Sequence, residues 1–369
     1  MAWFFCPTQI FMEQNALKNN AAVLSGLGRR CLVVTGKRSA AASGVLGDLA
    51  EVLPPLGIEY EIFDKIEPNP SIHTCREGGR RARALGADFI LGVGGGSPLD
   101  AAKAVAAFAA NDAAFEAAGD DDTALFDPLP NAPLPVAAIP TTAGTGSEAN
   151  LFSVLTLPET GVKRTFKTPA SYPVVAFVDP RYTLSLPYDQ TVSTALDAFC
   201  HCAESYYSPK ATALTRALCA EGAGRLWRGL LAAEGDDLGL ANRESLMLGS
   251  TLGGICIGQT GTGFPHPMGY NLTLSHGVPH GAACAVFEGE FLRQQMMAAP
   301  ELDFLGAAGL PDEALDKIPA MAGVIPRLTD AQIERYVALV LDAANFANSV
   351  APLTDPAAIA AVYRKLLGA

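Results

Sequence analysis

Histidine is scarce in this sequence, and most of it falls in one region. Four of the five histidines, among them His201, His266 and His280, lie within one third of the chain. Asp197 and His201 stand four residues apart in TALDAFCHCAESYY, a spacing that puts both side chains on one face of a helix. One carboxylate with three imidazoles suits a borderline divalent ion such as Fe²⁺, Zn²⁺ or Co²⁺. Taken singly, each histidine is more often an ordinary buried or surface residue, so the pattern indicates a metal site without fixing its members.

Two glycine-rich turns could bind a dinucleotide. LGVGGGSPLD (residues 91–100) joins a predicted strand to a predicted helix, and IPTTAGTGSE (residues 139–148) follows another strand. Glycines let the backbone approach a pyrophosphate, and free N–H groups at a helix start attract it. Turns at the carboxyl ends of parallel strands share the edge of the sheet where ligands bind. The alternative is two tight turns with a structural role only.

The elements that must position these residues change character along the chain. Strands are predicted at residues 30–35, 60–63, 88–93 and 136–139, with helices at 44–53, 72–85 and from about 97 through 110. Strands alternating with helices predict a parallel sheet. Residues 111–135 are predicted to be a surface loop with a short helix. Helices dominate after Pro187, beginning with residues 191–207 and 211–233. We therefore expect a Rossmann-like α/β dinucleotide-binding domain (residues 1–185) and an all-α metal-binding domain (residues 186–369).

Composition excludes several classes of partner. The chain has 369 residues, a formal net charge of −12 and a pI near 4.9, which argues against nucleic acid and anionic membranes. The start of the chain lacks the features of a signal peptide, and no apolar run approaches membrane-spanning length. None of the eight cysteines forms a CxxC pair, so we expect reduced thiols and a cytoplasmic protein. Cys200 and Cys202 flank His201, but on a helix they point about 100° away from it and are poor co-ligands.

Several strings together resemble one known family. GGGSPLDAAKA, PTTAGTGSE, LDAFCHCAESY and HPMGY…HGVPHG occur in the order and with nearly the spacing of the iron-dependent (group III) alcohol dehydrogenases. Further matches are EPNP at residues 67–70, VDP at 178–180 and the region 348–352. The resemblance runs from about residue 32 to 367, and the combination of motifs is highly specific.

The resemblance implies a metal in a cleft between the two domains, held by Asp197, His201, His266 and His280. Iron is expected, although the same ligands accept zinc. It also implies positions that bind the cofactor: Gly94, Gly95, Gly96 and Ser97 for the pyrophosphate, with Asn69, Asp100, Thr141, Thr142, Thr145, Lys163 and Leu184 lining the cofactor. A homodimer is expected on the same ground.

Two departures from the family pattern matter. Many members carry an acid after the first strand that binds the adenosine ribose, but here Gly36 stands there, followed by Lys37, Arg38 and Ser39. A carboxylate would repel the 2′-phosphate of NADP, whereas Lys37 and Ser39 could bind it, so we expect NADP(H) to be preferred over NAD(H). The alternative is that Lys37 and Arg38 only face solvent.

The second departure concerns the proton relay. Several members have a histidine four residues after the third ligand, where this chain has Tyr270. The unperturbed pKa of tyrosine, near 10, makes it a poorer shuttle at neutral pH. His276 is the other candidate, unless it simply faces solvent.

These residues predict hydride transfer between a nicotinamide and a small alcohol or aldehyde, with the metal as Lewis acid. Phe152 and Phe264 are candidates for an apolar substrate pocket, or for ordinary core. The alternatives are a dehydroquinate synthase-like lyase using metal and NAD, a glycerol dehydrogenase-type polyol oxidoreductase, and a catalytically inactive binding protein. The first would need cations near the metal for an acidic substrate, and residues 266–280 contain no Lys or Arg.

Overall fold

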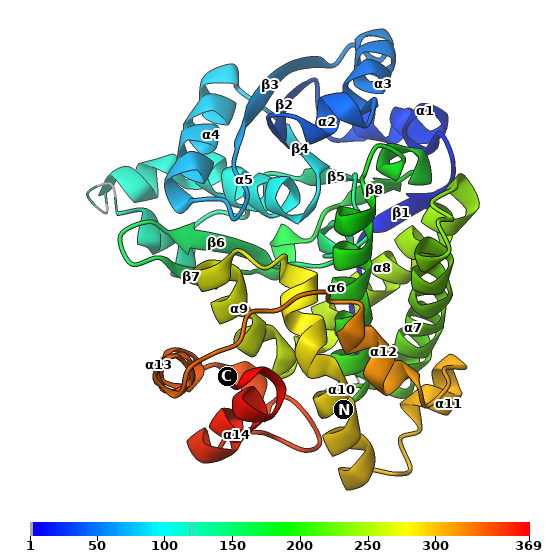
Figure 1. Cartoon of the computed structure of the whole chain (residues 1–369). Coiled ribbons are helices and arrows are strands. Elements are labelled where there is room, and N and C mark those ends of the chain that lie inside the picture. Colours follow the sequence, from blue (N-terminus) through cyan, green and yellow to red (C-terminus); the bar gives the residue numbers. More distant parts are fainter. Residues whose placement is uncertain (1–2, 118, 120) are drawn as a thin grey trace. The chain divides into compact units, whose positions relative to one another are not determined.

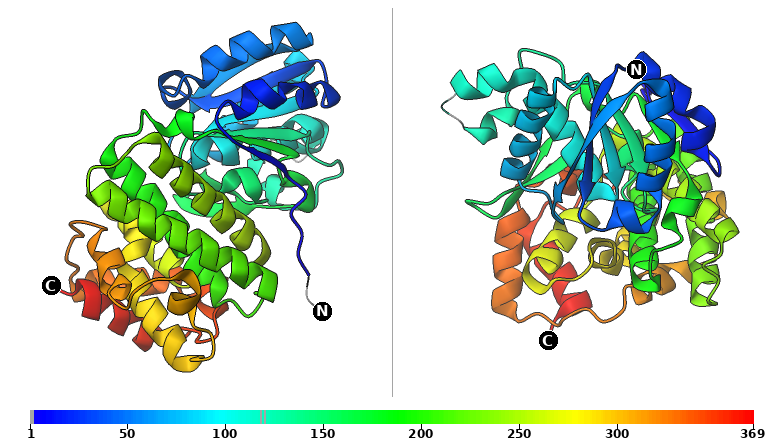
Figure 2. Two further views of the ribbon diagram at one scale, coloured as in Figure 1. Left: turned by 90° about the vertical axis from the view of Figure 1, so that its right-hand side faces the viewer. Right: turned by 90° about the horizontal axis from the view of Figure 1, so that it is seen from above.

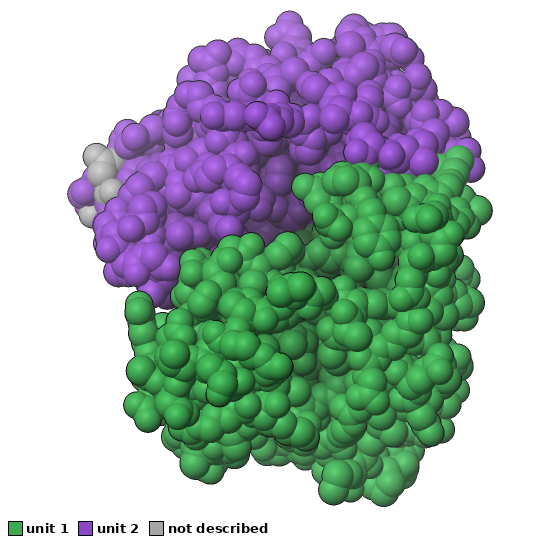
Figure 3. Space-filling model, in the orientation of Figure 1, with its two compact units in different colours: residues 1–5, 143–145, 186–369 green, residues 6–142, 146–185 purple. Residues whose placement is uncertain are grey.

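The computed structural model describes residues 3–117, 119 and 121–369. The chain divides into two compact units (Figure 3). We call residues 6–142 and 146–185 the α/β unit, and residues 1–5, 143–145 and 186–369 the helical unit.

The α/β unit is built on a parallel sheet of six strands (Figure 1). Its strand order is β1 (Gln9–Met12), β8 (Val175–Val178), β5 (Val136–Pro140), β4 (Phe89–Gly94), β2 (Arg30–Gly36) and β3 (Glu59–Ile66). Every pairing in this sheet is parallel. Parallel strands are buried on both faces, which explains the continuous apolar runs in β4 and β8.

Helices cover both faces of this sheet, and alternate residues of β2 define the two cores. Leu32 and Val34 pack with α4 (Ile72–Leu85) and α5 (Gly96–Ala117). Cys31 and Val33 face the other way, toward α1 (Ala16–Asn20), α2 (Ser39–Ala42) and α3 (Val45–Val52). The predicted α/β fold class is confirmed for this half of the chain.

Some elements of the α/β unit escaped prediction. The edge strand β1, strand β8 and the antiparallel hairpin β6 (Ser153–Leu157)–β7 (Val162–Phe166) were not predicted. Helix α5 runs to Ala117, seven residues into the predicted loop, with non-helical φ/ψ at Asn111. The short helix predicted in that loop is the 3-10 turn Asp122–Phe126.

The described residues of the helical unit form α-helices, one 3-10 turn (Ala344–Ala347) and no strand, in agreement with the predicted helical character of this half. Helix α6 (Tyr188–Tyr206) is buried along most of its length and contacts three neighbours (Figures 1 and 2). These neighbours are α7 (Ala213–Glu234), α8 (Leu240–Thr260) and α10 (His280–Ala298), and α9 (Pro265–His276) packs on α10. The remaining helices are α11 (Phe304–Ala308), α12 (Ala314–Ala320), α13 (Asp330–Val340) and α14 (Pro356–Leu367). Among the described residues, none of the helices combines the length and apolar character that crossing a membrane requires.

Candidate metal and cofactor sites

Three helices of the helical unit bring the four predicted metal ligands together. Asp197 and His201 lie one turn apart on α6, His266 is in the first turn of α9, and His280 begins α10. The Nε2 atoms of His201, His266 and His280 lie 3.8, 3.6 and 3.7 Å from Oδ1 of Asp197. Three ring nitrogens therefore surround one carboxylate oxygen.

Close helix packing makes this arrangement possible. At Gly281 an added Cβ would lie 1.8 Å from the backbone oxygen of Ser193 and 2.8 Å from the backbone nitrogen of Asp197. Only glycine permits the start of α10 to approach α6 this closely. The approach places the His280 ring beside Asp197.

The electrostatics of the cluster suit a cation. Burial opposes the charge on Asp197, but the rings of His201, His280 and His266 hold the pKa of its carboxyl well below the usual range. Burial lowers the pKa of His201 to about 4. Burial also opposes charge on His266, yet the carboxylates of Glu204 and Asp197 outweigh it and raise its pKa to about 10. Asp197 therefore stays ionised and the His201 ring stays neutral, and these are the forms of both groups that bind a cation.

Two polar atoms at its centre have unmet bonding capacity. Oδ1 of Asp197 and Nε2 of His266 are buried and have no hydrogen-bond partner among the described residues. Such groups are costly unless something binds them. Because carboxylate oxygen and imidazole nitrogen are donors that Fe²⁺ and Zn²⁺ accept, the residues fit a divalent metal.

Glu204 is a further residue of the site that the sequence analysis missed. Its Oε1 accepts a hydrogen bond from Nδ1 of His266 at 2.6 Å, and its Oε2 accepts one from the N–H of Gly263 at 2.5 Å. An ionised carboxylate only accepts, so this contact leaves Nε2 of His266 as the nitrogen available to a cation. Glu204 follows His201 by three residues on α6, so the helical spacing that paired Asp197 with His201 also indicates it.

A second buried acid lies next to Glu204. Glu288 on α10 is fully buried, and neither carboxyl oxygen has a hydrogen-bond partner among the described residues. Its carboxylate lies within 4.8 Å of ligand atoms of Glu204 and Cys200. Burial and the charge of Glu204 raise the pKa of Glu288 well above its ordinary value, which favours the neutral form of this carboxyl.

The two relay candidates differ in their surroundings. The ring of Tyr270 stacks on the ligand His280, with ring centroids 5.4 Å apart. His276, at the end of α9, has its Nε2 2.8 Å from the hydroxyl of Tyr336 on α13. The predicted pocket residue Phe264 is fully buried against Phe291, which accounts for it as core.

In the α/β unit the first glycine-rich turn lies beside the start of the second. The N–H of Thr141 donates to the carbonyl oxygen of Gly94 at 2.9 Å, because β4 and β5 are neighbours. Gly94 has a φ of +144°, and a Cβ there would lie 2.7 Å from the Pro98 ring. A Cβ on Gly95 would meet the Thr142 side chain at 3.2 Å. The turns are thus compact, and the hydroxyl of Thr141 is buried without a hydrogen-bond partner among the described residues.

Ser97 and Asp100 tie the first turn to its surroundings. Oγ of Ser97 accepts a hydrogen bond from the backbone N–H of Asn69, a residue with a φ of +56°. Asp100 accepts hydrogen bonds from Oγ of Ser147 at 2.5 Å and from the N–H of Val154 at 2.8 Å. Its carboxylate therefore holds the second turn in place.

A fully buried lysine, also missed from the sequence, completes this network. Nζ of Lys103 donates to Oγ of Ser147 and to the carbonyl oxygen of Phe152, both at 2.7 Å. Burial lowers the pKa of Lys103 to about 8, although the charges of Asp100 and Glu148 oppose this. Phe152, the second predicted pocket residue, is partly buried in the α/β unit, and the ammonium of Lys167 lies 5.8 Å from its ring centroid.

The remaining cofactor candidates are spread over both units. Lys163 is on β7 and contributes to the electrostatics of Asp100, and Leu184 is half exposed after the 3-10 turn Pro180–Thr183. Thr145 belongs to the helical unit, unlike Thr141 and Thr142. Gly36 ends β2, Lys37 and Arg38 are exposed, and Ser39 begins α2.

Comparison with known proteins agrees with this architecture. The family model for iron-containing alcohol dehydrogenase matches residues 7–180, and that for the C-terminal part of the Fe-containing alcohol dehydrogenase family matches residues 191–344. A 1,3-propanediol dehydrogenase of Klebsiella pneumoniae is 33% identical over 308 residues, which cover 81% of this chain and 76% of that protein. A sulfoacetaldehyde reductase of Bilophila wadsworthia is 33% identical over 74% of this chain and 70% of its own length.

Solved structures extend the similarity to the whole chain. An iron-containing alcohol dehydrogenase of Thermotoga maritima is 35% identical, with a TM-score of 0.89 over 100% of both chains. A sulfoacetaldehyde reductase of Bifidobacterium kashiwanohense, solved in complex with NAD⁺, is 25% identical, with a TM-score of 0.84 over 100% of this chain and 99% of that one. The chain therefore belongs to the iron-containing alcohol dehydrogenase family and is a metal-dependent oxidoreductase of the alcohol dehydrogenase and aldehyde reductase class.

Proposed function

We propose that Asp197, His201, His266 and His280 hold one catalytic divalent metal ion, and that the enzyme interconverts a small aldehyde and its primary alcohol. The observation that carries the proposal is the meeting of three Nε2 atoms within 4 Å of Oδ1 of Asp197. A metal held by these residues would supply Lewis-acid chemistry at the substrate oxygen, and a nicotinamide cofactor would supply or accept the hydride.

The protein's own residues prepare the site for that chemistry. Glu204 fixes the ring of His266, and the burial of Asp197, His201 and His266 keeps water from their donor atoms. His280 is the most exposed of the four, with 32% of its side chain accessible, so we place the substrate approach on its side.

We assign the proton relay to Tyr270 rather than His276. Tyr270 stacks directly on His280, whereas the Nε2 of His276 is engaged by Tyr336. Tyr270→Phe should lower kcat and change the pH–rate profile, whereas His276→Ala should leave that profile unchanged. The opposite result would transfer the role to His276.

We propose that NADP(H) is the preferred cofactor. Gly36 offers no carboxylate to repel a 2′-phosphate, and Lys37 and Arg38 place two exposed cations directly after β2. The ratio of kcat/KM for NADPH over NADH should exceed one and should reverse in Gly36→Asp. A wild-type preference for NADH would refute the assignment.

The substrate class is proposed from the site and from the relatives. The relatives act, by their names, on 1,3-propanediol, sulfoacetaldehyde and long-chain primary alcohols, which share a terminal carbonyl or carbinol carbon. A panel of such aldehydes with NADPH, run separately with Fe²⁺ and Zn²⁺, tests this class. No turnover of any member with either metal would overturn it.

We also propose a cytoplasmic homodimer, and sedimentation velocity would test the oligomeric state.

A further inference from the structure

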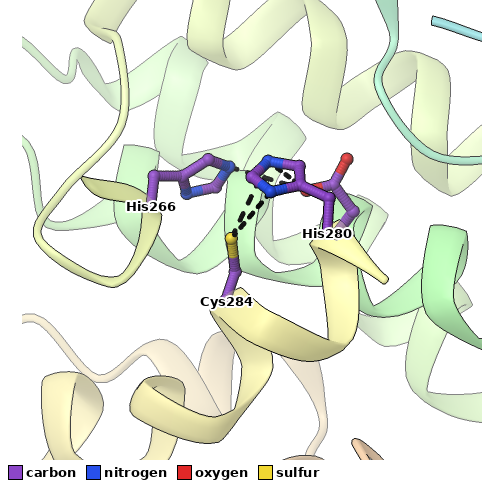
Figure 4. Close-up of side chains that lie close together, drawn as sticks. His266, His280 and Cys284 are labelled. Atoms are coloured by element: carbon purple, nitrogen blue, oxygen red, sulfur yellow. Dashed lines mark hydrogen bonds and ion pairs between the residues drawn. The ribbon is translucent and has the colours of Figure 1, made fainter. Parts of the chain in front are cut away.

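A cysteine lies at the edge of the metal-ligand cluster. Cys284 follows His280 by four residues on α10, so both side chains lie on one face of that helix. Its Sγ lies 3.8 Å from each ring nitrogen of His280 (Figure 4). Cys284 is buried, and its sulfur reaches the site through the same close packing of α10 that Gly281 permits.

The sulfur belongs to a tight set of donor atoms. One ligand atom each from Asp197, His266, His280 and Cys284 all lie within 4.8 Å of one another. Zinc–sulfur and zinc–nitrogen bonds are about 2.3 and 2.0 Å long, so two donors on opposite sides of one ion lie roughly 4.3 Å apart. The observed separations therefore allow all four atoms to contact a common ion after small side-chain movements.

A second observation indicates that a ligand binds between these donor atoms. Asp197 and His266 are only 4% and 3% exposed, and Oδ1 of the first and Nε2 of the second have no hydrogen-bond partner among the described residues. Both atoms belong to the same set as the Cys284 sulfur. The two cysteines that flank His201 in the sequence do not belong to this set of donor atoms. Cys200 lies with Glu204 and Glu288, and Cys202 lies against Gly222.

We propose that Cys284 is an additional ligand of the metal in the substrate-free enzyme, an inference that rests on the metal site proposed above. When the metal binds, the thiol gives its proton to solvent and the sulfur donates an electron pair to the ion. Thiolate is a soft donor and selects Zn²⁺ more strongly than carboxylate and imidazole ligands do. Cys284 thereby shifts the preference of this site from Fe²⁺ toward Zn²⁺.

Cobalt absorption tests the inference directly, because Co²⁺ bound by thiolate has an intense near-ultraviolet charge-transfer band. The full-length protein is stripped of metal, loaded with Co²⁺ without oxygen, and compared with Cys284→Ser, Cys284→Ala and Cys256→Ala. Cys256 is a buried cysteine on α8 outside the set and serves as the control. We expect the band in the wild type and in Cys256→Ala, and its loss in both Cys284 variants. Competition with a chelator should show Zn²⁺ affinity falling by at least roughly tenfold in those variants, with a smaller loss for Fe²⁺.

The outcomes separate this inference from the metal site itself. Visible d–d bands without the charge-transfer band in the wild type would show Co²⁺ at the site without sulfur, and would overturn the role of Cys284 alone. A band that persists in Cys284→Ser and Cys284→Ala would also overturn it. Absence of both kinds of band, with no bound Co²⁺ after dialysis, would overturn the metal site together with this inference. Circular dichroism confirms that each variant is folded before it is scored.

Discussion

Replacing Glu204 by glutamine removes the charge that orients His266 without changing the shape of the side chain. The carboxylate accepts two hydrogen bonds, from Nδ1 of His266 at 2.6 Å and from the N–H of Gly263 at 2.5 Å. A glutamine amide offers one oxygen and one NH₂ group, so one of the two N–H donors must face another donor as long as His266 keeps its proton on Nδ1, the form that leaves Nε2 available to a metal. The variant therefore loses one buried contact outright and weakens the other.

The size of the effect follows from that loss. An unsatisfied buried donor costs about 1–3 kcal/mol, so the metal-free Glu204→Gln protein should lose roughly 2 kcal/mol of unfolding free energy. Loss of the carboxylate partner of a metal-binding histidine typically lowers metal affinity by about 10- to 100-fold, and we expect the same range for Zn²⁺. The free energy of unfolding is measured by urea denaturation, and metal affinity by competition with a chromophoric chelator.

Glu288→Gln is the matched control, because it makes the same chemical change at the neighbouring buried acid. Burial raises the pKa of Glu288 well above its ordinary value, which favours its neutral carboxyl, so replacing it by a neutral amide changes the charge of the site little. We expect Zn²⁺ affinity in Glu288→Gln to stay near that of the wild type. Unchanged affinity in Glu204→Gln, or an equal loss in both variants, would refute the orienting role of Glu204.

Three further predictions concern other parts of the chain. Gly281→Ala forces a methyl group to within 1.8 Å of a backbone oxygen of α6, so it should cost about 1–3 kcal/mol of stability and weaken metal binding; wild-type values for both would contradict the packing. Thr141→Val removes a buried hydroxyl that has no hydrogen-bond partner among the described residues, so thermal stability should be kept while KM for NADPH rises; an unchanged KM would remove Thr141 from the cofactor site. His73 lies between Asp122 and Glu159, whose hydrogen bonds raise its pKa above 6.5, so its stabilising effect is fully present below that pH and is lost as the pH rises through the folded-state pKa. The difference in unfolding free energy between wild type and His73→Gln should therefore shrink from pH 5.5 to pH 9, and a pH-independent difference would contradict this assignment.

The sequence predicts those helices and strands whose hydrophobic residues recur at a clear helical spacing or form a continuous apolar run. The apolar strands β2, β4 and β5 and the helices α4 and α6 are visible in this way. The edge strand β1 is only four residues long and pairs with β8, which is more than 160 residues away in the sequence. Its pairing depends on tertiary contacts that no local pattern encodes.

Part of the metal site can likewise be predicted from local spacing in the sequence, and part cannot. Spacing alone pairs Asp197 with His201, and the same rule reaches Glu204 from His201 and Cys284 from His280. Spacing cannot bring His266 and His280 to that pair, because their positions depend on how α9 and α10 pack against α6. The resemblance to a family supplied this information. The roles of Gly281 and Lys103 became clear only from the structure.

The metal content of the protein tests the central claim most directly. Three proteins are compared: the wild type, Asp197→Ala and the control Asp64→Ala, which replaces an exposed acid on β3. Each is dialysed against buffered Zn²⁺ or anaerobic Fe²⁺, and its bound metal is measured by mass spectrometry. Because three imidazole nitrogens surround Oδ1 of Asp197, we predict about one ion per chain in the wild type and in Asp64→Ala, and a loss of bound metal in Asp197→Ala. Equal metal content in all three proteins would contradict the assignment of the site.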